Sequence, residues 1–175
     1  LNIKTHIKRI RKKDNNIVAV LPPAGQASAG SETEYVMLGA HYDHLGRGET
    51  GGFRIKGEEG MIHNGADDNA SGVSTLLEMA AQLAERRQSH PQEFQRGVIF
   101  SFWSGEELGL IGSDRYAAKP TVDLKQVVAY LNFDMVGRLR ENKLTLQGVG
   151  SSSVWKKLIE RRNVLAGFDL TLQQD

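Results

Sequence analysis

The stretch YVMLGAHYDHLG, residues 35–46, decides the fold, because an apolar run ends there in a cluster of polar side chains. Residues 35–40 lack a two-residue alternation, which is typical of a strand buried on both faces. His41, Asp43 and His44 follow at once, although the whole chain has only five histidines. The stretch therefore predicts a buried strand that ends either in a hydrogen-bonded core histidine or in a metal site.

The rest of the chain alternates strand patterns with helix patterns. Further apolar runs of strand length cover residues 16–21, 97–103 and 127–133, and shorter candidates cover 143–147 and 168–172. Apolar residues recur at helical spacing in 71–87, 108–118 and 154–165. Strand–helix alternation predicts an α/β layered fold around a largely parallel sheet.

Composition excludes several classes of function. The chain has 175 residues, which suits one domain, and its net charge of +1 gives no reason to expect nucleic acid as a partner. Cysteine is absent, so disulfides, thiolate metal sites and a cysteine nucleophile are excluded. No run approaches the roughly 18 apolar residues that a membrane span needs.

Acidic and histidine side chains stand where the predicted strands end. In largely parallel α/β sheets, ligand sites lie beyond the carboxyl ends of the strands. Carboxylates that share a site repel one another, and a divalent cation removes that penalty. Imidazole and carboxylate without thiolate suit zinc, and also manganese or cobalt. One tetrahedral zinc has too few ligand positions for so many carboxylates, whereas two metals about 3.5–4 Å apart have enough. The side chains are His41, Asp43, Asp67, Asp68, Glu106, Glu107 and Asp134.

The strand ends suggest individual roles. We expect His41 to bind a metal directly, and Asp43 to hold the other ring nitrogen of His41 with its carboxylate. His44 either lines the site or is a hydrogen-bonded loop histidine. Asp134 ends an apolar strand, where an unpaired carboxylate is costly. Its partner is therefore a metal or, alternatively, Arg138.

Two acidic pairs leave their assignments open. Asp67 and Asp68 precede a predicted helix, so one of them caps the helix while the other can bridge two metals. Glu106 and Glu107 are neighbours whose carboxylates leave the backbone in different directions. One of them can bind metal while the other acts as a general base on a water.

Four motifs occur in the order LGAHYDHLG (38–46), NGADDNASGVSTLLEMA (64–80), VIFSFWSGEELGLIGSDRYA (98–117) and VVAYLNFDMVGR (127–138). Together they resemble the M28 family of zinc aminopeptidases, in particular bacterial leucyl aminopeptidases. The resemblance covers roughly residues 14–140 and implies a three-layer α/β sandwich, with a mixed, mostly parallel sheet flanked by helices. It also implies one zinc-peptidase catalytic domain over residues 1–175.

The resemblance also implies roles for individual residues. It implies two zinc ions in a complete site, with Asp68 bridging them and Glu106 as the general base. The other implied roles are His41 and Asp134 as ligands of one zinc, Glu107 as a ligand of the other, and Asp43 as the catalytic carboxylate behind His41.

One feature departs from the family. The family completes the Glu107 zinc with a histidine well after Asp134, whereas this chain has no histidine after His90. We therefore expect a catalytic domain that is truncated before its last histidine ligand; the alternative is that another residue or another chain supplies this ligand. Such a fragment can itself be inactive although the full-length protein is active.

The expected function follows from the resemblance. It is the hydrolysis of N-terminal peptide bonds of peptides or proteins, through a water bound by two zinc ions, with Glu106 as the base. The resemblance further implies an extracellular or periplasmic location, and it leaves the oligomeric state open. The alternatives are a non-catalytic, receptor-like member of the same fold, and a glutaminyl cyclase or carboxypeptidase of that fold.

Overall fold

The computed structural model forms two compact units, residues 1–135 and 136–175. The first unit contains the larger sheet and every predicted site residue, and the second contains a smaller sheet and one helix. The residues described are 3–5, 12–25, 33–48, 57 and 60–175.

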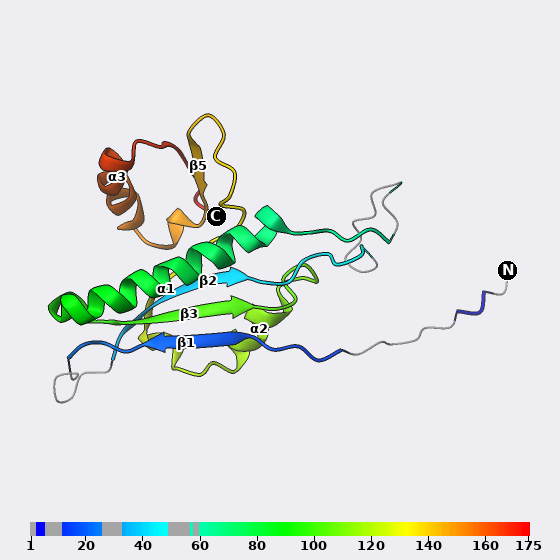
Figure 1. Cartoon of the computed structure of the whole chain (residues 1–175), viewed down its shortest axis with the longest axis horizontal. Coiled ribbons are helices and arrows are strands. Elements are labelled where there is room, and N and C mark those ends of the chain that lie inside the picture. The colour runs from blue at the N-terminus through cyan, green and yellow to red at the C-terminus, as the bar shows by residue number, and fades with distance from the viewer. Residues whose placement is uncertain (1–2, 6–11, 26–32, 49–56, 58–59) are drawn as a thin grey trace. The chain divides into compact units, whose positions relative to one another are not determined.

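A four-stranded mixed sheet organises the first unit (Figure 1). Its strands stand in the order β1-β3-β2-β4. β2 runs parallel to both β3 and β4, and β1 pairs antiparallel with β3 at the edge. The predicted mixed, mostly parallel sheet is confirmed. The strands are β1 (Ile17–Leu21), β2 (Tyr35–His41), β3 (Gly97–Trp103) and β4 (Val127–Asn132).

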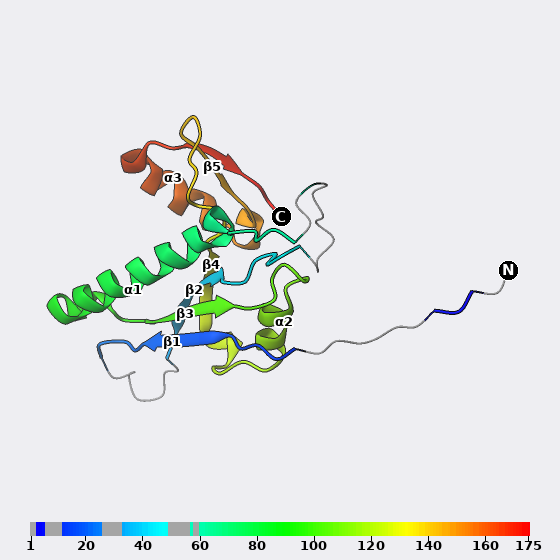
Figure 2. The same ribbon diagram turned by 45° about the vertical axis from the view of Figure 1, so that its right-hand side comes forward.

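Helices cover both faces of this sheet. Leu76 of α1 packs in a buried cluster with Leu38 of β2. Tyr116 of α2 packs with Met37, the neighbouring residue of the same strand. Because successive side chains of a strand point to opposite faces, α1 and α2 lie on opposite sides of the sheet (Figure 2). The helices and helical turns of this unit are α1 (Gly72–Ser89), α2 (Ile111–Ala118), Ala66–Ser71, Pro91–Glu93 and Leu124–Gln126.

The second unit is a small parallel β-α-β arrangement. β5 (Lys143–Leu146) pairs in parallel with β6 (Asp169–Leu172), and α3 (Trp155–Ala166) connects them after a short turn at Val149–Ser151. The predicted strands and helix of this segment are confirmed to within one residue at each end. Within the described part of the chain, no helix is both long enough and apolar enough to cross a membrane.

The predicted helix over 108–118 begins three residues late. Gly109 and Leu110 have φ values of 99° and 60°, so the backbone there is left-handed and cannot be part of an α-helix. α2 therefore begins at Ile111. The predicted strand over 35–40 continues to His41, which pairs with Trp103 as part of the ladder.

Leu76 provides a test of the packing between α1 and the sheet, because its side chain is fully buried. We expect Leu76→Ala to lower the free energy of unfolding by about 2–5 kcal/mol, since it removes buried methyl groups and leaves a cavity. Urea denaturation measures this change. The matched control is Leu77→Ala on the same helix, where Leu77 is 56% exposed. An equal loss of stability in both variants would contradict this packing.

Candidate metal centre

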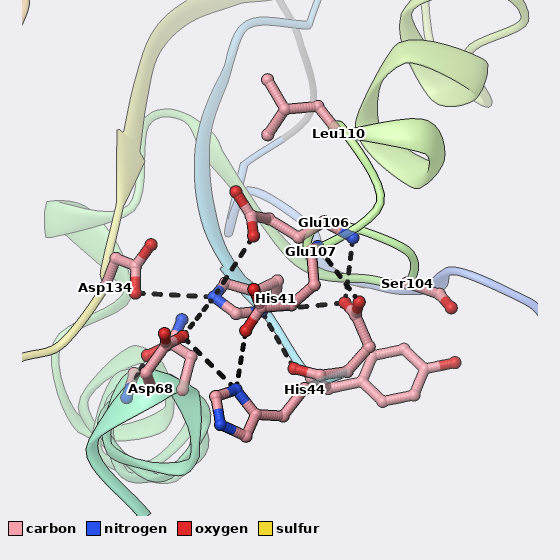
Figure 3. A network of polar contacts seen from close by, with 12 residues as sticks. His41, His44, Asp68, Ser104, Glu106, Glu107, Leu110 and Asp134 are labelled. Atoms are coloured by element: carbon pink, nitrogen blue, oxygen red, sulfur yellow. Dashed lines mark hydrogen bonds and ion pairs between the residues drawn. The ribbon is translucent and has the colours of Figure 1, made fainter. Parts of the chain in front are cut away.

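The register of the parallel strands brings the site residues to one edge of the sheet. His41, the last residue of β2, pairs with Trp103, the last residue of β3. On the other side of β2, Gly39 pairs with Asn132, the last residue of β4. Residues that follow these three strands therefore meet, and the segment before α1 joins them (Figure 3). They are His41, Asp43, His44, Asp68, Glu106, Glu107 and Asp134.

His41 is the centre of a first group of possible metal ligands. Its side chain is only 2% exposed, and its Nε2 lies 3.1 Å from Asp68 Oδ1 and 3.5 Å from Asp134 Oδ1. One donor atom from each of these three residues lies within 4.8 Å of the other two. Glu106 Oε2 is 3.9 Å from the same nitrogen. The first group, His41, Asp68 and Asp134, can therefore hold one cation.

Asp43 supports the site in a way that differs from the expectation. The main-chain oxygen of Asp43, at 3.1 Å, is the hydrogen-bond partner of His41 Nδ1, while its carboxylate stands 3.7 Å away. That carboxylate instead accepts hydrogen bonds from the backbone N–H groups of Glu106, at 3.0 Å, and Glu107, at 3.3 Å. Asp43 therefore fixes the tautomer of His41 through its backbone and fixes the loop after β3 through its side chain.

The two glutamates turn to different neighbours, as their positions in sequence predict. Glu107 Oε1 lies 2.6 Å from His44 Nδ1, whereas Glu106 points towards His41. His44, Asp68 and Glu107 form a second group whose donor atoms also lie within 4.8 Å of one another. Asp68 belongs to both groups, which places its carboxylate between two possible cation positions.

Asn69 is a structural residue of the site that the sequence analysis did not single out. Its side chain is almost fully buried, with Nδ2 donating to the main-chain oxygen of Phe133 at 2.9 Å. Its Oδ1 accepts from the backbone N–H groups of Gly72 and Met135. Asn69 therefore ties the start of α1 to the end of β4, and so brings Asp68 close to Asp134. An asparagine three residues before the first residue of α1, where its side chain can accept from the N–H of Gly72, is the signal that could have identified it.

Charge crowding changes the protonation behaviour of the site. Burial lowers the pKa of His41, but the carboxylates of Asp134 and Glu106 outweigh burial, and the pKa of His41 lies above its usual value. Burial raises the pKa of Glu106, and Asp134 and Glu107 add to this rise although His41 opposes it. The raised pKa of His41 reflects its attraction to these carboxylates, and the raised pKa of Glu106 reflects first its burial and then the neighbouring carboxylates.

The donor atoms fit divalent cations. Each group offers one imidazole nitrogen and at least two carboxylate oxygens, and the chain has no thiolate. Such a set suits zinc, with manganese and cobalt as chemically acceptable substitutes. A shared carboxylate between two groups is the arrangement found in two-metal sites.

Glu106 provides a test of this crowding through stability. Because its pKa is raised in the folded state, ionised Glu106 destabilises the metal-free fold at neutral pH. We expect Glu106→Gln to raise the free energy of unfolding at pH 7, measured by urea denaturation with a chelator present. The gain should vanish below the ordinary glutamate pKa of about 4.3, where Glu106 is protonated in both states. The control is Glu78→Gln on the exposed face of α1, and a gain there at pH 7 as large as that at Glu106 would contradict the crowding.

Comparison with known proteins assigns the chain to a family. The model of peptidase family M28 matches residues 16–173. The "Probable lipoprotein aminopeptidase LpqL" of Mycobacterium tuberculosis is 34% identical over 137 residues, which cover 78% of this chain and 22% of that protein. An "Aminopeptidase" of Pseudomonas aeruginosa is 30% identical over 152 residues, which cover 86% of this chain and 23% of that protein. A "Probable leucine aminopeptidase" of Arthroderma otae is 30% identical over 148 residues, which cover 85% of this chain and 36% of that protein.

The two kinds of similarity differ in how much they cover. The chain spans only 22% to 36% of the length of these relatives. The family match, by contrast, extends over nearly the whole chain and through both compact units. The chain belongs to peptidase family M28.

Proposed function

We propose that this chain forms one catalytic domain of a metal-dependent aminopeptidase, which hydrolyses the N-terminal peptide bond of peptides or proteins. The observation that carries this proposal is the carboxylate of Asp68, which is shared by two groups of metal-competent side chains beside Glu106. The relatives support the reaction type, because three of them are named as aminopeptidases. The family match through both compact units supports a single domain.

The chain's own residues would hold two zinc ions. His41, Asp68 and Asp134 would hold one of them, and Asp68 and Glu107 would hold the other. When bound, two zinc ions lower the pKa of a water, polarise the scissile carbonyl and stabilise the negative charge that develops on its oxygen.

Glu106 is the proposed general base. Its carboxylate lies beside the His41 group without belonging to either group of three donors. Its raised pKa brings it closer to the range in which a carboxyl both accepts and returns a proton. Glu106 takes a proton from the attacking water and passes it to the leaving amine. Its carboxylate is thereby restored for the next turnover. Asp43 holds the backbone of Glu106 and thereby positions this base.

The names of the relatives favour a peptide with a free N-terminus as the substrate. We propose an extracellular or periplasmic location together with this substrate, because one relative is named a lipoprotein aminopeptidase.

Two rival functions receive less support. A non-catalytic member of the fold would have no need of the crowded carboxylates, whose mutual repulsion disfavours the metal-free fold. A glutaminyl cyclase or carboxypeptidase would keep the ligands, but the relatives reported above carry the name aminopeptidase.

Glu106→Gln tests the proposed base. We expect the rate of hydrolysis of aminoacyl-p-nitroanilides to fall by about 10²–10⁴-fold, because a positioned general base contributes that much. Zinc content by elemental analysis should stay at the wild-type value. Glu78→Gln on the surface of α1 is the matched control and should keep full activity. Retained turnover in Glu106→Gln would remove Glu106 from this role.

Three ligand substitutions test whether Asp68 is shared. Isothermal titration of the metal-free protein with Zn²⁺ should show that Asp68→Asn weakens both binding steps. Asp134→Asn should weaken only the binding of zinc by the first group, and Glu107→Gln only the binding of zinc by the second group. Each of these carboxylates lies in one group alone. Each affected step should weaken by more than about 100-fold, above the range typical of residues that only support a ligand. A loss confined to one step in Asp68→Asn would contradict the bridging role.

A further inference from the structure

The start of β1 lies at the same edge of the sheet as the metal centre. β1 runs antiparallel to β3, and its first residue, Ile17, pairs with Phe102 near the end of β3. The residues that precede β1 therefore run beside those that follow β3 (Figure 1). Residues 14–16, with the sequence DNN, are named the polar strap. They bond the loop 104–110, which connects β3 to α2 and carries Glu106.

Asp14 of the polar strap joins the loops that follow β2 and β3. Its Oδ2 accepts from Ser104 Oγ at 2.6 Å, and its Oδ1 accepts from Tyr42 OH at 3.1 Å. Tyr42 OH also donates to the main-chain oxygen of Asn15 at 2.5 Å. Ser104 is only 8% exposed and lies at the margin of the metal centre (Figure 3). The hydrogen bonds from Ser104, from the backbone of Asn15 and from Tyr42 lower the pKa of Asp14, so an ionised carboxylate connects the two loops.

Asn16 fixes the same loop through its backbone. Its Oδ1 accepts from the backbone N–H of Ser104 at 3.1 Å, and its Nδ2 donates to the main-chain oxygen of Gly112 at 2.7 Å. A Cβ atom at Gly112 would lie 2.2 Å from the main-chain oxygen of Ser104, closer than real side chains approach. The first turn of α2 therefore touches the backbone at the start of the loop 104–110. Asn16 ties these two ends of the loop together.

The loop 104–110 has little freedom between these ends. The main-chain oxygen of Glu106 accepts from the backbone N–H groups of Gly109, at 2.8 Å, and Leu110, at 2.9 Å. The carboxylate of Asp43 accepts from the N–H of Glu106 at 3.0 Å. A displacement of Ser104 is therefore transmitted to Glu106, two residues further along the chain.

We propose that Asp14 and Asn16 are positioning residues for Glu106. By fixing Ser104, they keep the carboxylate of Glu106 beside His41, where its Oε2 lies 3.9 Å from Nε2. This inference rests on the proposed function, in which Glu106 is the general base, and extends it to two residues outside both donor groups. The physical reason is that proton transfer depends steeply on the position of the base.

The competing role for the polar strap is a contribution to global stability alone. Amide hydrogen exchange of the metal-free chain, followed by NMR, separates the two roles because it resolves local opening from global unfolding. In Asp14→Ala and in Asn16→Ala, we expect the N–H of Glu106 to exchange about 3–10-fold faster, since one or two hydrogen bonds of the loop are lost. The N–H of Phe100, a buried residue of β3, should exchange at the wild-type rate.

Two further variants sharpen this comparison. Asp123→Ala is the matched control, because Asp123 is an exposed aspartate that also accepts a backbone N–H, that of Lys125. It precedes β4 and thus lies at the opposite edge of the sheet, so exchange at Glu106 should stay at the wild-type rate. Tyr42→Phe removes only the hydroxyl group and should reproduce part of the effect of Asp14→Ala.

Kinetics of the zinc-loaded chain test the catalytic consequence. A displacement of about 1 Å can cost roughly 100-fold in rate. Because Asp43 still holds the loop, we expect a smaller fall, of about 10-fold, in kcat for aminoacyl-p-nitroanilides in Asp14→Ala and in Asn16→Ala. KM should be unchanged, since a general base acts only in the transition state. Zinc content by elemental analysis should equal that of the wild-type chain.

The outcomes separate this inference from the function on which it rests. Wild-type exchange at Glu106 in both variants would overturn it, and so would equal acceleration at Glu106 and Phe100. Wild-type kcat in both variants, or a rise in KM alone, would overturn the positioning role and leave the proposed function intact. A zinc-loaded wild-type chain without turnover would overturn the proposed function together with the catalytic part of this inference. Hydrogen exchange would then still decide whether the polar strap holds the loop.

Discussion

The parallel register of β2 with β3 and β4 is the constraint on which the rest of the structure depends. Backbone hydrogen bonds pair His41 with Trp103 and Gly39 with Asn132, so the three strands end side by side. A slip of one residue would turn His41 to the other face of the sheet. Packing on both faces prevents such a slip, because Met37 and Leu38 each belong to a different buried cluster.

This register gathers like charges that the fold by itself does not favour. Burial and neighbouring carboxylates raise the pKa of Glu106, and the carboxylates of Asp134 and Glu106 raise the pKa of His41 against the effect of its burial. Hydrogen bonds to the backbone hold the site residues in place: the side chain of Asn69 bonds three backbone groups, and the carboxylate of Asp43 accepts from two backbone N–H groups. A cation bound between these carboxylates would relieve their repulsion.

The two donor groups share one carboxylate but differ in their surroundings. His41 lies at the end of a central strand and is almost inaccessible, with 2% of its side chain exposed. His44 belongs to the loop that follows, and 21% of its side chain is exposed. Under the proposed function, the first position is therefore more buried by the sheet than the second.

The sequence by itself determined the layered α/β class, the four central strands and most of the side chains that meet at the edge of the sheet. Apolar runs without alternation identified strands covered on both faces, and the polar residues after them marked the edge at which ligands meet. These signals are local, and they are strong because a buried strand tolerates few polar side chains.

Tertiary structure alone decided which atoms meet. Sequence placed Asp43 beside His41, but only the folded chain shows that its carboxylate bonds the backbone after β3. The left-handed residues Gly109 and Leu110 delayed α2, since backbone conformation there is not evident from the apolar pattern. Likewise, the contact of His44 with Glu107 joins residues 63 positions apart. Such pairings depend on strand register and on side-chain direction across the sheet edge, which no local pattern encodes.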